Sequence, residues 1–229
     1  DHELKISGEE FVYLDITHKD PKEVMSHFPN IYKKCLSIGI DLTKDMIPVV
    51  PAAHYCCGGI KVNLNGESSI RRLYALGEAS STGLHGGNRL ASNSMMEAAV
   101  YADAAARHAI SVIDSIELQR DIPAWDYEGT AVPEEMALIT QDYKEMQQIM
   151  TNYVGIVRSD VRLERAKRRL EIIFKETEEL YLKSTLSQHL CELRNMIAVG
   201  YLIIKQAEAR HESVGLHYSI DYPAKPVEI

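Results

Sequence analysis

The sequence predicts a mainly α-helical protein with a small α/β part. The last hundred residues carry three apolar stripes, and each stripe repeats with the period of a helix. Ahead of them, a short apolar run, "LYALG", predicts a strand that leads into a glycine-rich loop. After that loop, a long alanine-rich segment from about Ser94 to Ser115 is expected to be helical. Together these observations place a small strand–loop–helix part before a helical part.

The N-terminal third is expected to hold short elements only. The run "EFVYLD", from Glu10 to Asp15, has the apolar and aromatic content of a short strand. Two short helical pieces follow and are separated at Pro29. The proline-bounded stretch "DMIPVVPAAHYCCGG" is then expected to be a loop. Beyond it, "IKVNLNGES" alternates apolar and polar residues and contains Asn65-Gly66, a hairpin turn signal.

The C-terminal part is predicted to be a three-helix bundle. Residues 116–132 break the periodic pattern and are expected to be a linker. Short connections between the striped segments that follow make them antiparallel neighbours. We interpret the stripes as core residues, and they show no pattern typical of a catalytic or binding site. Their members are Met136, Ile139, Tyr143, Met146, Met150 and Tyr153; Leu163, Ala166, Leu170, Ile173, Thr177 and Leu180; and Leu186, Leu190, Leu193, Ile197, Tyr201, Ile204 and Ala207.

Composition excludes several classes of function. The net charge of −8 argues against a nucleic-acid binder, which needs a concentrated basic surface. No apolar run approaches the roughly 20 residues that cross a bilayer. Four cysteines without CxxC spacing indicate free thiols in a reducing cytoplasm, and the scattered histidines predict no metal site. The sequence does not begin with methionine, so we expect the chain to be one piece of a longer polypeptide.

The stretch "GEASSTGLHGGNRLASNSMMEAAVYADAAARHA" carries the residues best suited to chemistry. Its glycines allow the main chain to approach a ligand closely, and "SNS" at 92–94 provides good N-cap residue types. The helix N-terminus favours an anion, and Arg89 can bind a carboxylate with two hydrogen bonds. On residues alone, two interpretations stay open: an anion site, or an ordinary loop with a solvent-facing arginine. His54, taken alone, is equally consistent with a structural histidine.

Longer motifs resemble a known family. The runs "VPAAHYCCGGIKVN" and "LYALGEASSTGLHGGNRLASNSMMEAAVYA" resemble the succinate dehydrogenase/fumarate reductase flavoprotein family, and in particular the C-terminal half of its L-aspartate oxidase branch. "YVGIVRSDVRLERA" and "LCELRNMIAVGYLI" resemble the helical domain of that branch. The resemblance implies an FAD enzyme that oxidises L-aspartate to iminosuccinate, passes hydride to the flavin and is reoxidised by oxygen or fumarate. Iminosuccinate then feeds quinolinate formation in NAD biosynthesis.

The resemblance also implies roles for individual residues. His54 and Arg89 would bind the carboxylates of a dicarboxylate substrate, L-aspartate or fumarate. Glu78 would hydrogen-bond FAD, and the backbone of Ser94 and Met95 would meet the flavin ring. The implied helix N-terminus then points at the flavin edge on which charge collects during reduction. No residue of this chain is assigned as a catalytic base, because the family's proton-accepting arginine is expected upstream of it.

Some positions depart from the family pattern. Met95 stands where the family usually has leucine, and Gly87 where it commonly has alanine. "HESVGLHYSIDYP" resembles a family segment with Val214 in place of an arginine. His85 is given only a supporting role. The dinucleotide fold with GxGxxG is absent, so we expect this chain alone neither to hold FAD tightly nor to oxidise aspartate.

With the family included, the fold is predicted to be the end of an FAD-binding domain followed by the bundle. The missing FAD-binding part is the expected partner, and exposed apolar surface favours a homo-oligomer. Two alternatives stay open: a fragment of a succinate or fumarate oxidoreductase, and a non-catalytic helical interaction module. The predicted domains are a capping-domain remnant at 1–50, the end of the FAD-binding domain at 51–115, a linker at 116–132, the bundle at 133–213 and a tail at 214–229.

Overall fold

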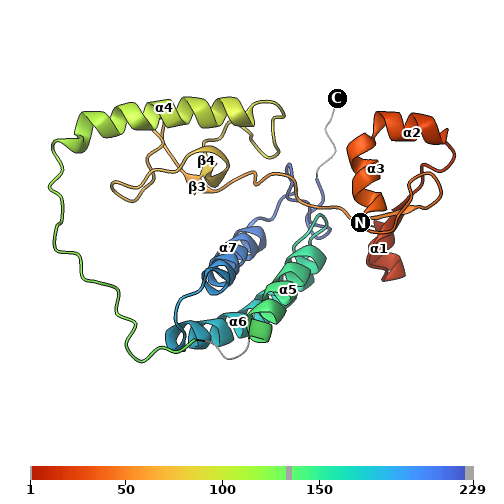
Figure 1. Ribbon diagram of the computed structural model, residues 1–229. Coiled ribbons are helices and arrows are strands. Elements are labelled where there is room, and N and C mark those ends of the chain that lie inside the picture. Colours follow the sequence, from red (N-terminus) through yellow and green to blue (C-terminus); the bar gives the residue numbers. More distant parts are fainter. Residues whose placement is uncertain (1, 133–135, 225–229) are drawn as a thin grey trace. The chain divides into compact units, whose positions relative to one another are not determined.

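The computed structural model describes residues 2–132 and 136–224 (Figure 1). Its chain divides into two compact units, Asp1–His54 and Tyr55–Ile229. The predicted bundle and tail ranges include residues 133–135 and 225–229, which lie outside the described residues. The domain ranges given above therefore stay predictions.

The first unit is small and mixed. Its strands β1 and β2 pair antiparallel, with Leu14 opposite Ile47. The predicted strand within residues 10–15 and the two helices separated at Pro29 are confirmed. The expectation of a loop around Pro48 was wrong, because pairing with β1 makes a strand of a three-residue segment with no clear local pattern. The elements are α1 (His2–Ser7), β1 (Val12–Leu14), α2 (Pro21–His27), α3 (Pro29–Leu36) and β2 (Ile47–Val49).

The second unit begins with the predicted strand–loop–helix part. Strand β3 (Ile60–Lys61) pairs in parallel with β4 (Ser80–Ser81), and the long helix α4 spans Ser94–Ile113. The helix confirms its prediction from sequence. The strand expected at "LYALG" was wrong: its last residue opens the 3₁₀ turn η1 (Gly77–Ala79), and the pairing strand starts after that turn. The short apolar run has the composition of a strand, but the segment whose backbone pairs with β3 is β4, which lies farther along the chain.

The Asn65-Gly66 signal corresponds to a real turn. The Gly66 N–H donates to the Asn63 carbonyl oxygen at 3.0 Å, and Gly66 has a φ of +73°, which favours glycine. The turn is followed by a single antiparallel bridge between Glu67 and Tyr74. The prediction of a turn is confirmed, while its flanks form one bridge and not a regular hairpin.

Three helices form the bundle, as predicted: α5 (Met136–Tyr153), α6 (Asp160–Lys183) and α7 (Gln188–Ala209) (Figure 1). Each helix contacts the other two. Serine side chains cap two of them: the Ser159 hydroxyl accepts from the Arg162 N–H, and the Ser187 hydroxyl accepts from the Leu190 N–H. Such caps satisfy N–H groups that the helix itself leaves without partners.

The bundle core follows the predicted stripes closely. Met136 and Leu186 are exceptions, with 45% and 39% of their surface exposed, because one starts its helix and the other precedes α7. Ile149 and Val154, absent from the stripes, are buried instead. The buried members are Ile139, Met146, Ile149, Val154, Leu163, Ala166, Leu170, Ile173, Leu190, Leu193, Ile197, Ile204 and Ala207.

A C-terminal turn, residues 214–217, packs against the start of α6 through a buried histidine. His217 accepts a hydrogen bond from Arg158 at Nδ1 (2.9 Å) and donates from Nε2 to the Arg210 carbonyl oxygen (3.1 Å). These partners require the neutral ring with its proton on Nε2. Burial and, second, the Arg158 charge lower the pKa of His217 from its usual 6.5.

Among the described residues, no helix is long and apolar enough to span a membrane.

We expect the core of the bundle to be far more sensitive to truncation than its surface. Leu193→Ala removes a fully buried side chain and should lower the free energy of unfolding by about 2–5 kcal/mol. Leu202, on the same helix, is 56% exposed, so Leu202→Ala should cost only about 0.5 kcal/mol. Urea unfolding of both variants measures the difference. Equal losses would contradict the assignment of this core.

The buried His217 predicts an acid-sensitive tail. Its pKa is lower in the folded state than in the unfolded chain, so stability is complete above pH 6.5 and falls between pH 6.5 and the lower folded pKa. The free energy of unfolding, measured against pH, should therefore decline over that interval. His217→Asn should flatten the decline, while His189→Asn, at an exposed position, should leave it unchanged. An unaltered profile for His217→Asn would refute this explanation.

Candidate functional site

The glycine-rich loop between β4 and α4 folds back onto the first turns of α4. The Arg89 Nε donates to the Ser94 hydroxyl at 3.0 Å, and Ser94 is the first residue of the helix. The Arg89 guanidinium also lies over the Tyr55 ring, 4.9 Å from its centroid. A cation held over an aromatic face and bonded through Nε has a fixed direction. The arginine is therefore anchored to the protein and is not a freely moving surface side chain.

The start of α4 confirms the expected boundary but not the expected cap. Asn93 is the residue before the helix, yet its side chain makes no capping hydrogen bond; its Nδ2 donates to the Ala91 carbonyl oxygen. Ser92 adopts a φ of +67°, a conformation that non-glycine residues rarely take. The chain turns sharply here, and the side-chain cap predicted within "SNS" is absent.

Glu78 lies in the turn η1, and its side chain contacts the first residues of the second unit. Its Oε1 accepts a hydrogen bond from the Cys56 N–H at 2.8 Å. Burial, followed by the charge of Glu78 and the neighbouring Cys57, raises the pKa of the Cys56 thiol. A thiol with a raised pKa is a poor nucleophile at neutral pH. Glu78 therefore organises the backbone there, and Cys56 is not an activated cysteine.

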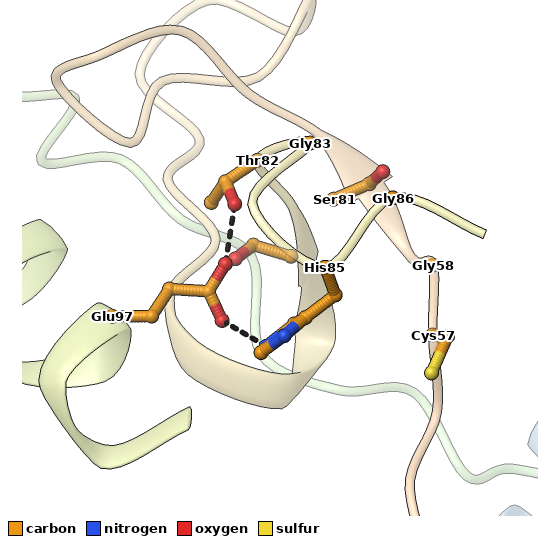
Figure 2. Close-up of a pocket in the computed structure, with 9 residues that line it drawn as sticks. Cys57, Gly58, Ser81, Thr82, Gly83, His85, Gly86 and Glu97 are labelled. Carbon is orange, nitrogen blue, oxygen red and sulfur yellow. Dashed lines mark hydrogen bonds and ion pairs between the residues drawn. The ribbon is translucent and has the colours of Figure 1, made fainter. Parts of the chain in front are cut away.

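Below the loop is a small polar hollow of about 50 Å³ (Figure 2). Figure 2 shows the carboxylate of Glu97 at its wall, between the hydroxyl of Thr82 and the ring of His85. The His85 Nε2 lies 3.0 Å from Glu97 Oε2, and only 2% of the Glu97 side chain is exposed. The hollow is lined by Cys57, Gly58, Ser80, Ser81, Thr82, Gly83, His85, Gly86 and Glu97.

A contact between two glycines ties the loop to the C-terminal turn. The Leu216 N–H donates to the Gly87 carbonyl oxygen at 2.8 Å. Gly215, with a φ of +58°, lies so close that a Cβ atom there would overlap the Gly87 backbone. A Cβ at position 87 would itself lie 3.2 Å from the Gly215 Cα. Glycine at position 87, a departure from the family pattern, is therefore the residue that suits this close approach best.

The predicted site residues are thus partly brought together. Arg89 meets Ser94, and Met95 follows at the helix start with 81% of its surface exposed. Glu78 contacts the backbone that follows His54. His54 is the last residue of the first unit and Arg89 belongs to the second, so their pairing stays a prediction. Among the described residues, no cluster of three or more His, Cys, Asp or Glu side chains is arranged to hold a metal ion.

Sequence reasoning missed residues that support the loop. Tyr55, Thr82 and Glu97 had no assigned part, and His85 had only an undefined one. The available signal was Glu97, an acidic residue in the first turns of an alanine-rich helix. A carboxylate in such a position is buried only with hydrogen-bond partners, and the histidine of the preceding loop was a suitable candidate.

Comparisons with known proteins show what the chain is similar to. Residues 1–95 match the model of the FAD binding domain, and residues 143–226 match that of the fumarate reductase flavoprotein C-terminus. The chain is 48% identical to the L-aspartate oxidase of Yersinia pestis over 97% of its own length and 42% of the relative's. It is 43% identical to that of Vibrio cholerae serotype O1 over 100% of its length and 43% of the relative's.

The chain is homologous to the L-aspartate oxidases. It spans less than half the length of the curated relatives that it matches. Among solved structures, the apo Sdh1 complex of Mycobacterium smegmatis matches with a TM-score of 0.77 and 27% identity, over 99% of this chain and 41% of the other. The predicted resemblance and the mainly α fold with a small α/β part are confirmed. FAD is confirmed as the cofactor of the family to which the chain is related.

The glycine contact yields a test with a matched control. Gly215→Ala should strain the backbone, and its new Cβ atom should also collide with Gly87. Gly86→Ala should cause the same kind of backbone strain, at a φ of +57°, but its Cβ atom would have no neighbour within 4 Å. Gly86→Ala should cost roughly 1–2 kcal/mol of stability. Gly215→Ala should cost clearly more and make the C-terminal turn easier to cleave in limited proteolysis. Equal effects of the two substitutions would contradict a specific role for the contact.

Proposed function

We propose that this chain is the C-terminal part of an FAD-dependent L-aspartate oxidase that converts L-aspartate to iminosuccinate. The observation that carries the proposal is the 48% identity along nearly the whole chain, combined with an arginine anchored at the start of a helix. In this assignment the product feeds quinolinate formation, the route to NAD. The protein would act in the cytoplasm, consistent with its free cysteines.

Arg89 is proposed to bind a substrate carboxylate. Its Nε is held by Ser94 and its face by Tyr55, so within the described part of the chain the terminal guanidinium nitrogens are available to a ligand. A guanidinium and a carboxylate form two parallel hydrogen bonds, which fix orientation as well as position. His54 is proposed as the second donor. Its place in the run "HYCCGGI", which resembles the family's histidine before a Gly-Gly strand start, supports its assignment.

The residues present fit an FAD cofactor. The N-terminus of α4, without a side-chain cap, provides N–H groups and a partial positive charge for the flavin edge, with Ser94 and Met95 in the first turn. Met95 is largely exposed, as a residue that covers a ligand would be. Glu78 provides an acceptor for a hydroxyl of the cofactor. When bound, FAD supplies the two-electron acceptor that takes hydride from the substrate; oxygen or fumarate would reoxidise it.

The alternatives are less well supported. Identity falls from 48% for an L-aspartate oxidase to 27% for the matched Sdh1 chain, which disfavours a succinate or fumarate oxidoreductase. A non-catalytic helical module would not need an arginine bonded to a helix start and stacked on tyrosine. We also propose that the remaining FAD-binding part is the partner of this chain, and that alone it neither holds FAD tightly nor turns over aspartate.

Removing the guanidinium tests the proposed function in the full-length flavoenzyme to which we assign the chain. Arg89→Leu should raise the KM for L-aspartate roughly 10- to 100-fold and lower turnover, because a charged hydrogen-bonding partner is lost. The matched control is Arg107→Leu on α4, where the arginine is 79% exposed and pairs only with Asp103 among its described neighbours. Steady-state kinetics measure both. Unchanged kinetics for Arg89→Leu would favour the non-catalytic module.

A further inference from the structure

Both ring nitrogen atoms of His85 are engaged. Nδ1 accepts a hydrogen bond from the Leu90 N–H at 3.1 Å, and Nε2 lies 3.0 Å from the Glu97 carboxylate (Figure 2). A backbone amide can only donate, so Nδ1 must carry the lone pair and Nε2 the proton. The ring therefore joins a helix side chain to the backbone of the loop. No ring nitrogen is left over for a substrate.

Glu97 fixes this arrangement from within α4. Its second oxygen atom accepts a hydrogen bond from the Thr82 hydroxyl, and its side chain is almost completely buried. A buried carboxylate with two donors has one preferred orientation. It selects the Nε2–H form of His85, just as carboxylates commonly select the tautomer of a histidine partner. Glu97 and Ser94 belong to the same first turns of α4, so one rigid helix holds both the imidazole and the arginine.

Two routes of contact connect His85 to Arg89. Leu90, whose amide it accepts, is the next residue after Arg89. Tyr55 contacts both side chains, with its ring centroid 5.3 Å from that of His85 in an edge arrangement and 4.9 Å from the Arg89 guanidinium carbon. One route sets the backbone beside the arginine, and the other sets the aromatic surface beneath it. Loss of the imidazole would loosen both.

We propose that His85 is a positioning residue for Arg89, and that Glu97 holds its ring in the tautomer this requires. The inference rests on the proposed function, because it takes Arg89 as the group that binds a dicarboxylate. His85 touches neither substrate nor cofactor in this scheme. It sets the direction of the guanidinium, and its effect on binding passes entirely through Arg89.

Substituting His85 by asparagine or by glutamine tests the two hydrogen bonds of its ring separately. His85→Asn retains an acceptor near the position of Nδ1, for the Leu90 amide, while His85→Gln places its amide near Nε2, toward Glu97. In the FAD-loaded full-length enzyme, His85→Ala should raise the KM for L-aspartate about tenfold, with a smaller change in kcat. His85→Asn should restore most of the affinity, and His85→Gln less. His108→Asn is the control, since the Nδ1 of this α4 histidine is also hydrogen-bonded, 2.7 Å from the Tyr74 hydroxyl.

A double-mutant cycle tests whether the effect passes through the arginine. Binding of malonate, a dicarboxylate without the amino-bearing carbon that is oxidised in L-aspartate, is measured by calorimetry, so that the readout does not depend on turnover. His85→Ala should weaken malonate binding about tenfold in the parent enzyme and less than twofold in an Arg89→Leu background. FAD content and the unfolding midpoint are measured for every variant. If His85→Ala does not fold, the comparison of the Asn and Gln variants decides.

Each outcome has one meaning. A tenfold effect that disappears in the Arg89→Leu background supports the proposal. Equal effects of His85→Ala in both backgrounds, equal behaviour of Asn and Gln, or a change in FAD content alone would overturn it. An unsubstituted enzyme that neither oxidises L-aspartate nor binds malonate would instead overturn the proposed function. The two failures are therefore distinguishable.

Discussion

The candidate site depends on how the loop before α4 is anchored to the first turns of that helix. Two side chains do this: Arg89 bonds the hydroxyl of Ser94, and His85 bonds the buried carboxylate of Glu97. A loop with several glycines has many accessible conformations, and fixing it costs conformational entropy. Anchoring at two points of one helix offsets that cost. It also places a guanidinium next to a helix N-terminus, which is the combination suited to a carboxylate ligand and a flavin edge.

The bundle contributes to the site through its C-terminal turn. Leu216 donates to the Gly87 carbonyl of the loop, while His217 of the same turn is held by Arg158 at the start of α6. The same few residues therefore connect the helical domain and the loop of the candidate site. Val214, which stands where the family has an arginine, bonds His217 through its backbone and packs near Gly87. These contacts of the turn are mainly made by the backbone, so they do not require an arginine side chain at position 214.

Elements with a repeated pattern were predictable from the sequence, and elements formed by distant pairing were not. The stripes on α5, α6 and α7 recur over five or six turns, so individual errors such as Met136 do not change the result. Strands β2 and β4 are two or three residues long, too short for any pattern, and exist because a partner strand lies beside them. In the site, motif resemblance indicated Arg89 and Ser94, but the contacts of Tyr55 and Thr82 join positions far apart in the chain.

The sequence by itself determined the mainly α class, the long helix after the glycine loop, and the residue types able to bind a dicarboxylate and a flavin. The class and the helix follow from local periodicity, and the residue types follow from the family resemblance; neither needs knowledge of neighbours in space. Only the tertiary structure decided that Glu97 is buried against His85, that His85 holds the backbone beside Arg89, and that Gly87 and Gly215 touch. The physical reason is that burial and hydrogen-bond partners are set by packing, which brings together residues that local sequence does not connect.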